Sequence, residues 1–259
     1  MSHENEYPDS LIKCLELIWG DGYMAPGGPG NVANLLDSID THGKRILDIG
    51  CGLGGPAFEM ARTHGAEVVG IDLEAPLIAR AQRAAKVHGL ENRCSFQTVE
   101  IGPLPFDDGS FDVVVSSGAF TQVADKIGVL GESLRVLRPG GELRCYDWLK
   151  NAGDYSDDMQ YWFELEGITY GLETLEEYAQ HIRDAGFEQV SARDATDWYR
   201  VEARREYALM QGDLYPRMVE LLGQADADYR VENWRVLVLV IDQGEMRQGY
   251  LRGTRPAFG

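Results

Sequence analysis

A glycine-rich turn constrains the fold of this chain more than any other feature of its sequence. The run DIGCGLGG (48–55) joins an apolar segment at 45–50 to a helical pattern at 57–65. Glycines allow a tight turn and let the backbone approach a ligand closely. The helix that follows contributes unpaired N–H groups and the positive end of its dipole. The run therefore predicts a strand, a ligand-binding turn and a helix in succession.

Strand-like and helix-like segments alternate from residue 45 onward. Strands are expected at 45–50, 67–73, 93–99, 111–117, 142–148 and 187–196, and helices at 57–65, 75–90, 127–141 and 174–186. This alternation predicts an α/β fold whose parallel sheet is covered by helices on both faces. Helices are also expected at 8–20 and 31–39, and an aromatic-rich helical region at 197–232.

Charge and composition exclude several classes of partner. The 259 residues carry 24 basic and 42 acidic side chains, a formal net charge of −18. Duplex nucleic acid and anionic membranes would be repelled by this charge. No apolar run reaches the roughly 18 residues of a membrane span, and the first residues show no signal peptide. The four cysteines lack the spacing of a zinc site, so we expect no metal and a cytoplasmic location.

An acidic residue beyond the turn narrows the ligand to two classes. Asp72 ends the second expected strand and can accept hydrogen bonds from both hydroxyls of a ribose. Nicotinamide-binding folds and class I methyltransferases, which bind S-adenosylmethionine (SAM), share this pattern. Asp48, at the start of the turn, suits the positively charged amino end of methionine, whereas a dinucleotide needs room for a pyrophosphate. SAM is the favoured interpretation; a nucleotide-binding oxidoreductase and a non-enzymatic SAM-binding protein are the alternatives.

The chain resembles the phosphoethanolamine N-methyltransferases and the related glycine, sarcosine and dimethylglycine N-methyltransferases. The resemblance is carried by LELIWGDGYMAPGG (15–28), DIGCGLGG, ETLEEYAQHIRDAGF (173–187), DWY (197–199), Trp234 and MRQGYL (246–251). It implies a Rossmann-like class I methyltransferase with a mainly parallel seven-stranded sheet and a helical cap over the active site. The implied division is an N-terminal lid (1–44), a SAM-binding core (45–196), a helical cap (197–246), and a last strand with its tail (247–259).

The segment WRVLVLVIDQ (234–243) is ambiguous by composition alone. Its β-branched residues favour a strand, whereas the resemblance implies a helix followed by a strand at about 248–255. We follow the resemblance and expect a helix.

The resemblance also implies which residues hold SAM and its product, S-adenosylhomocysteine. Leu73 is expected to pack on the adenine, and Glu100 to bind the adenine amino group with Ile101 beside it. The full set expected at the cofactor is Tyr23, Met24, Asp48, Gly50, Gly52, Gly54, Asp72, Leu73, Glu100, Ile101 and Ser117.

The acceptor side departs from the resembling enzymes. Their catalytic latch joins a tyrosine before the first helix to a histidine after the fourth strand; these positions hold Tyr7 and Gln122, our expected catalytic residues. Their phosphate-binding arginine falls near Ile168, while Trp148 and Tyr170 occupy substrate-binding positions. A phosphate without a basic partner would be poorly compensated.

We therefore expect a small-molecule acceptor that is not a phosphobase. The favoured reaction is methylation of the nitrogen of a small amine or amino-acid-like metabolite. O- or S-methylation of a metabolite or natural product, and methylation of phosphoethanolamine itself, remain alternatives. The five histidines fall in tails, loops or helix ends and are interpreted as surface residues. Asp147, at the end of the fifth strand, is expected either to face the pocket or to fix a loop.

Overall fold

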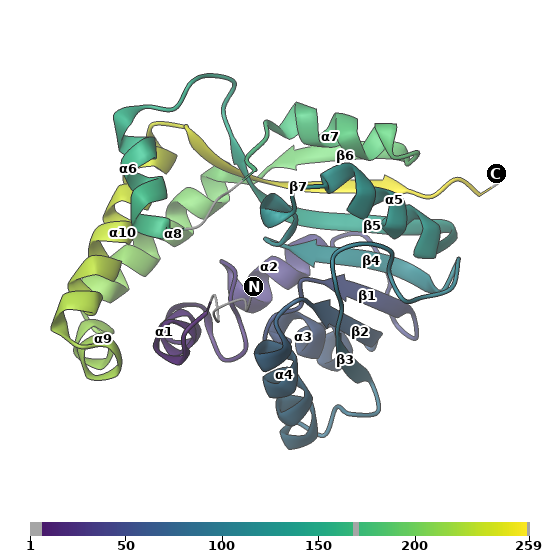
Figure 1. Cartoon of the computed structure of the whole chain (residues 1–259), viewed down its shortest axis with the longest axis horizontal. Coiled ribbons are helices and arrows are strands. Elements are labelled where there is room, and N and C mark those ends of the chain that lie inside the picture. The colour runs from purple at the N-terminus through teal and green to yellow at the C-terminus, as the bar shows by residue number, and fades with distance from the viewer. Residues whose placement is uncertain (1–6, 168–170, 258–259) are drawn as a thin grey trace.

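A single seven-stranded sheet organises the computed structural model, which describes residues 7–167 and 171–257 (Figure 1). The strand order is β3-β2-β1-β4-β5-β7-β6; the first five strands of this order are parallel, and β7 runs antiparallel to both of its neighbours. The expected α/β class and seven-stranded sheet are thereby confirmed. The strands are β1 (Arg45–Ile49), β2 (Glu67–Asp72), β3 (Cys94–Thr98), β4 (Phe111–Ser117), β5 (Leu137–Lys150), β6 (Glu188–Asp194) and β7 (Met246–Thr254).

Helices cover both faces of this sheet and build a further layer beside it. They are α1 (Asp9–Trp19), α2 (Gly28–Leu35), α3 (Gly55–Thr63), α4 (Ala75–Val87), α5 (Lys126–Val136), α6 (Asp157–Glu166), α7 (Leu175–Asp184), α8 (Thr196–Gln211), α9 (Tyr215–Leu222) and α10 (Gln224–Asp242), with a short 3₁₀ turn η1 (Phe120–Gln122). No helix within the described residues is long and apolar enough to cross a membrane.

The central strands are apolar on both sides because helices pack on both faces. Ile46 and Val113 pack in a core that includes side chains of α2, α3 and α4. Their chain neighbours Leu47 and Val114 point the other way and pack in a core that includes side chains of α5 and α7. All four side chains are fully buried. Continuous apolar runs in β1 and β4 therefore reflect a sheet covered on both faces.

The helical layer formed by α1, α6, α8, α9 and α10 has its own apolar contacts (Figure 1). Trp162 of α6, Tyr199 of α8 and Leu237 of α10 belong to one buried cluster. A second cluster joins Ile18 of α1 to Trp234 of α10, together with side chains of α8 and α9. Helix α8 also contacts β7, so the layer is attached to the sheet at β7.

Two expected helix boundaries are wrong. The helix expected at 31–39 is α2, which begins at Gly28 after a left-handed Gly27 and carries a proline in its first turn, where proline is well tolerated. The helix expected at 127–141 ends at Val136. Leu137 is extended and pairs with Phe111 of β4, and Pro139 shortly after it cannot continue a helix.

The C-terminal helical region is more divided than the sequence indicates. The single region expected at 197–232 is α8, α9 and the first part of α10, and breaks occur at Gly212 and Gly223. Helix α6 lies in a stretch without clear periodicity, and the Ser156 side chain caps it by accepting a hydrogen bond from the Met159 amide at 3.2 Å. The expected helix at 234–243 is confirmed as the second half of α10.

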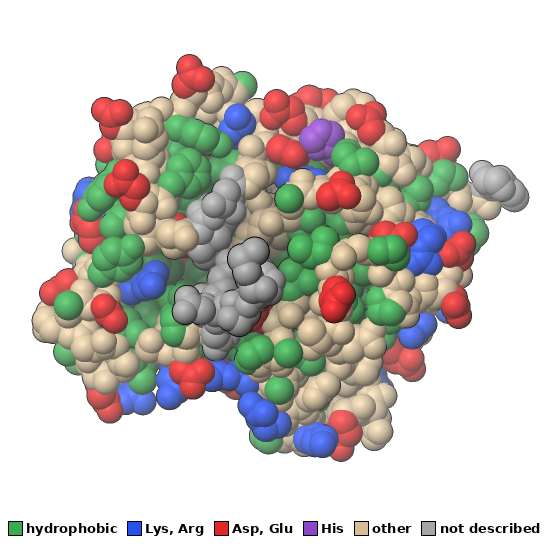
Figure 2. Space-filling model, viewed as in Figure 1, with side chains coloured by type: hydrophobic (Ala, Val, Ile, Leu, Met, Phe, Trp, Pro, Cys, Tyr) green, Lys and Arg blue, Asp and Glu red, His purple; other side chains and the backbone are tan. Residues whose placement is uncertain are grey.

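Acidic side chains are dispersed over the face of the molecule shown in Figure 2. Lys and Arg side chains gather mainly along the lower edge of this view. On this face the negative charge is spread out rather than concentrated in one patch.

Candidate functional site

The glycine turn after β1 has a backbone that only glycine adopts easily. Gly50, Gly52 and Gly54 have φ values of +76°, +51° and +87°. The Gly50 amide donates a hydrogen bond of 2.9 Å to the carbonyl of Ile71 at the end of β2. A Cβ atom on Gly50 would lie 2.2 Å from the Cβ of Ala119. The three predicted glycines therefore form a compact turn after β1. This turn packs against the end of β2 and against Ala119, which directly precedes η1.

Two predicted carboxylates lie at this turn. Asp72 accepts hydrogen bonds from the backbone amides of Gly52 at 2.9 Å and Glu74 at 3.0 Å, so its side chain is held in one orientation. Asp48 is 1% exposed, and its Oδ2 has no hydrogen-bond partner among the described residues. Burial, and then the neighbouring Asp72, raise the pKa of Asp48 to about 7. An unpaired buried carboxylate oxygen fits a cationic group such as the amino end of a methionine.

The front segment 20–25 crosses the glycine turn. The Gly22 carbonyl accepts a hydrogen bond of 2.9 Å from the amide of Gly55, the first residue of α3. A Cβ atom on Gly52 would lie 3.1 Å from the Met24 Sδ, so Met24 packs directly on the turn. Tyr23 is buried beside Gly55, and burial raises the pKa of its phenol. Tyr23 and Met24 thus lie against the turn, while their contact with SAM stays a prediction.

The two expected catalytic side chains lie within hydrogen-bond reach of each other. The Gln122 Nε2 of η1 donates a hydrogen bond to the Tyr7 Oη at 3.4 Å. The Tyr7 ring packs against a buried cluster that includes Leu53 of the glycine turn and Leu77 of α4. The pairing of these positions in space agrees with the expectation, while their part in a reaction stays a prediction.

Ser117 closes β4 next to the N-terminal helices. Its Oγ accepts a hydrogen bond from the Asn31 Nδ2 at 3.2 Å, and the Asn31 Oδ1 accepts one from the Tyr250 Oη at 2.8 Å. The next residue, Gly118, would bring a Cβ atom within 3.9 Å of the Trp148 Nε1. Ser117 is therefore a link between β4, α2 and β7.

The residues expected at the adenine lie on the rim beyond β2 and β3. Leu73 is 53% exposed and Ile101 is 82% exposed, which is unusual for large apolar side chains. Glu100 is also exposed. The Val99 amide donates to the Asp72 carbonyl at 3.0 Å, so the ends of β2 and β3 lie side by side. These exposed apolar side chains could cover a flat aromatic ring.

Aromatic side chains dominate the helical layer beside β5. The Trp148 ring lies 5.3 Å from the Tyr199 ring in an edge-on arrangement and 6.2 Å from the Trp162 ring. Tyr199 and Trp162 are almost fully buried, as expected for core residues. The predicted substrate-binding Tyr170 lies outside the described residues.

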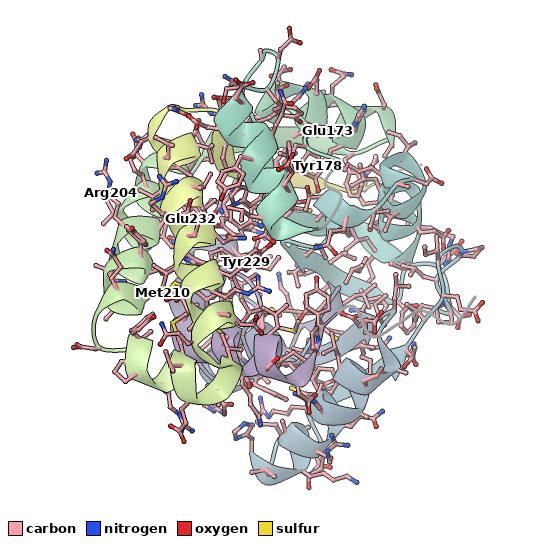
Figure 3. All side chains as sticks on the ribbon, turned by 60° about the vertical axis from the view of Figure 1, so that its left-hand side comes forward. Glu173, Tyr178, Arg204, Met210, Tyr229 and Glu232 are labelled. Carbon is pink, nitrogen blue, oxygen red and sulfur yellow. The ribbon has the colours of Figure 1, made fainter. Side chains whose placement is uncertain are left out.

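Asp147 belongs to a polar cluster that fixes the segment after η1. Its Oδ2 accepts a hydrogen bond from the Tyr178 Oη at 3.1 Å, and burial raises its pKa to about 7. The Lys126 Nζ lies 3.2 Å from the Glu173 Oε2 and 4.5 Å from the centre of the Tyr178 ring. Glu173 and Tyr178 are labelled at the edge of α7 in Figure 3. The sequence offered no signal for Lys126, because a lysine at a helix start is ordinarily solvated.

Glu206 is a second buried acid that sequence reasoning missed. It is fully buried on α8, and burial raises its pKa to about 7. Its carboxylate accepts hydrogen bonds from the indole N–H groups of Trp19 and Trp234. An available signal was its spacing from Ala203 and Met210, which places an acid on the apolar stripe of a helix.

Comparisons with known proteins agree with this arrangement. A family model described as "Methyltransferase domain" matches residues 40–204. The phosphoethanolamine N-methyltransferase of Triticum aestivum is 30% identical over 253 residues, which are 96% of this chain and 49% of the relative. The chain therefore spans about half the length of that relative.

Two further proteins extend the comparison. The 27-O-demethylrifamycin SV methyltransferase of Amycolatopsis mediterranei (strain S699) is 34% identical over 207 residues, covering 74% of this chain and 76% of the relative. A solved structure of Haemonchus contortus phosphoethanolamine N-methyltransferase 2, with phosphomonomethylethanolamine and S-adenosylhomocysteine, aligns with a TM-score of 0.90 at 23% identity. The alignment covers 98% of this chain and 59% of that one. This structural likeness shows that the two chains share a fold.

Proposed function

Because this chain belongs to the methyltransferase-domain family, whose enzymes take their methyl group from SAM, we propose that it methylates the nitrogen of a small amine or amino-acid-like metabolite. The observation that carries the proposal is the partly exposed Trp148 beside Gly118, whose chain neighbour Ala119 packs against Gly50 of the glycine turn. Aromatic faces attract a methylated ammonium group through cation–π interaction. The likeness to a phosphoethanolamine N-methyltransferase over almost the whole chain supports an amine acceptor.

On the cofactor side, we assign each group of SAM to residues of this chain. The unpaired Asp48 oxygen would hold the amino end, and Asp72 the ribose hydroxyls. Leu73 and Ile101 would sandwich or cover the adenine, with Glu100 at its amino group. Bound SAM supplies an electrophilic methyl group on a sulfonium. Residues 1–44 would act as a lid over this site, and residues 197–246 as a cap over the acceptor.

On the acceptor side, the main task of the protein is to hold a neutral amine in line with the methyl group and exclude water. An alkylamine with a pKa of ~10.4 is less than ~0.1% neutral at pH 7, which corresponds to roughly 4–5 kcal/mol that the site must offset. Burial of the amine beside Trp148 would disfavour the ammonium form and offset part of this. Tyr7 is the proposed latch and proton relay, and Gln122 orients its hydroxyl without titrating.

Phosphoethanolamine and oxygen acceptors are the second candidates. The Triticum aestivum relative supports the former, and the 27-O-demethylrifamycin SV methyltransferase supports the latter. We rank phosphoethanolamine lower because the buried Lys126 is already paired with Glu173 and the carbonyl of Gly171. A phosphate would have to compete with these partners for that charge.

A panel of acceptors tests the proposal. The purified protein is incubated with methyl-labelled SAM and with sarcosine, dimethylglycine, a diamine, phosphoethanolamine, a phenol or a thiol. Mass spectrometry then identifies the product. We expect N-methylation of an unphosphorylated amine, and no transfer to any acceptor by Asp72→Ala, which loses the ribose contact. Products formed only from phosphoethanolamine, or only on oxygen or sulfur, would contradict the proposal.

A further inference from the structure

A buried carboxylate connects three helices at the back of the lid region. Glu206 of α8 accepts a hydrogen bond from the Trp19 Nε1 of α1 at 2.9 Å and from the Trp234 Nε1 of α10 at 3.0 Å. The two indole rings lie 5.8 Å apart. Met210, one turn beyond Glu206, is buried in the same interface and lies beside α10 in Figure 3. The carboxylate is fully buried, so these two donors compensate much of its desolvation.

Trp19 is linked to the glycine turn through the segment 20–25 and the hydrogen bonds of Gly22. It is the last residue of α1, and the segment 20–25 begins directly after it. Within that segment the Gly22 amide donates to the Glu16 Oε1 of α1 at 2.9 Å. The Gly22 carbonyl accepts from the Gly55 amide at 2.9 Å, at the end of the turn. A shift of the C-terminal end of α1 would therefore move the segment that packs on the turn.

We propose that Glu206 is a positioning residue that fixes α1, and through it the segment 20–25, in the closed arrangement over the cofactor site. This inference rests on the proposed cofactor site and is independent of the acceptor. It assigns the carboxylate a role in cofactor affinity although its own contacts are to Trp19 and Trp234. The apparent affinity for SAM depends on the fraction of molecules in the closed, binding-competent state.

Glu206→Gln keeps the shape of the side chain and removes one of its two hydrogen-bond acceptors. A carboxylate accepts from both indoles, whereas the amide in Glu206→Gln has one oxygen and turns its NH₂ group toward the second indole N–H. Because the NH₂ group and the indole N–H are both donors, they cannot pair, and the link to α1 or to α10 is weakened. One indole N–H then lacks its acceptor, and an unpaired buried donor is costly enough to open the lid measurably.

Calorimetric SAM binding provides the first test. We expect the Kd for SAM to rise about tenfold in Glu206→Gln. The matched control is Glu202→Gln, one turn earlier on α8, where the carboxylate is partly exposed and paired with Arg205. This control should bind SAM as the wild type does. Failure of the wild-type protein to bind SAM would refute the proposed cofactor site itself, whereas equal affinity of wild type and Glu206→Gln would overturn only the positioning role.

A double-mutant cycle and hydrogen exchange separate positioning from general destabilisation. Trp19→Phe keeps a ring but removes the N–H, and we expect a similar rise in Kd and no further rise when it is combined with Glu206→Gln. Trp234→Phe leaves the link to α1 intact and should raise the Kd less. In Glu206→Gln the amides of Gly22 and Gly55 should exchange faster while those of β1 are unchanged. Equal acceleration in β1, or fully additive effects in the cycle, would contradict the inference.

Discussion

The chemistry of Asp48 depends on its surroundings more than on its sequence position. It is almost fully buried, has one oxygen without a partner in the part of the chain that the structure describes, and lies near a second carboxylate, Asp72. Its pKa of about 7 means that it is partly protonated at neutral pH in the ligand-free protein. A cation bound against it would favour the carboxylate form and release a proton.

This coupling predicts the pH dependence of cofactor binding. The affinity for SAM should rise from pH 6 to about 7.5, because more Asp48 is ionised, and should stop rising near pH 8, where an α-amino group of pKa ~7.7–8.0 loses its charge. Asp48→Asn should bind about tenfold or more weakly and lose the rise. Calorimetry in buffers of different ionisation enthalpy measures both affinity and proton release. A flat wild-type profile would refute the contact.

Substitution of Tyr7 distinguishes a catalytic role of its hydroxyl from a packing role of its ring. Tyr7→Phe keeps the ring against Leu53 but removes the hydroxyl that Gln122 contacts. Positioned proton-transfer groups contribute about 10²-fold or more, so kcat should fall by at least that order while the Kd for SAM changes little. Tyr215→Phe, at a partly exposed tyrosine at the start of α9, is the control and should leave both unchanged. A Tyr7→Phe enzyme with wild-type kcat would reduce Tyr7 to a packing residue.

At the scale of elements, the glycine turn is the unit that joins β1, β2, α3 and η1. Its position was predictable because the signal is local: glycines, a preceding strand and a following helix lie within 20 residues. The helix at 234–243 was not predictable from composition, because its β-branched residues favour a strand. This segment is helical because α10 packs against both α8 and α6, and these two helices come from distant parts of the chain.

The turn's dependence on glycine can be measured with two matched substitutions. Gly50→Ala forces a Cβ into contact with Ala119 at a positive φ, so we expect a loss of about 2–4 kcal/mol in the free energy of unfolding and no SAM binding. Gly131→Ala, inside α5 where a Cβ meets no atom within 4 Å, should be neutral or stabilising by up to about 1 kcal/mol. Urea unfolding measures both. Equal stability of the two variants would contradict this account.

At the scale of the whole molecule, three buried acids with strongly raised pKa values contribute to the pH dependence of stability. Burial raises the pKa of Asp48, Asp147 and Glu206 to about 7. The sequence could not predict this, because the environment of each acid is built by distant residues: Glu206, for example, contacts Trp19, 187 residues away. Each of these carboxyls holds its proton to higher pH in the folded state than in the unfolded chain.

The sign of the resulting effect follows from proton binding. Between about pH 4 and 7 the folded state binds more protons at these groups, so the free energy of unfolding should fall as pH rises and level off above 7. Urea unfolding at pH 5.5 and 8 should differ by a few kcal/mol, with lower stability at pH 8. Asp147→Asn, which retains a partner for Tyr178, should reduce this difference. Stability that is equal at the two pH values, or higher at pH 8, would contradict the raised pKa values of the three acids.

The position of β7 in the sheet determines when the sheet can be completed during translation. It lies between β5 and β6 although it follows both in sequence, with α6 to α10 and β6 synthesised between β5 and β7. On the ribosome, β1 to β5 can pair as they emerge. Among the described strands, β6 pairs with β7 alone. A pause before β7 would therefore leave an unpaired β5 edge exposed to chaperones and to other nascent chains.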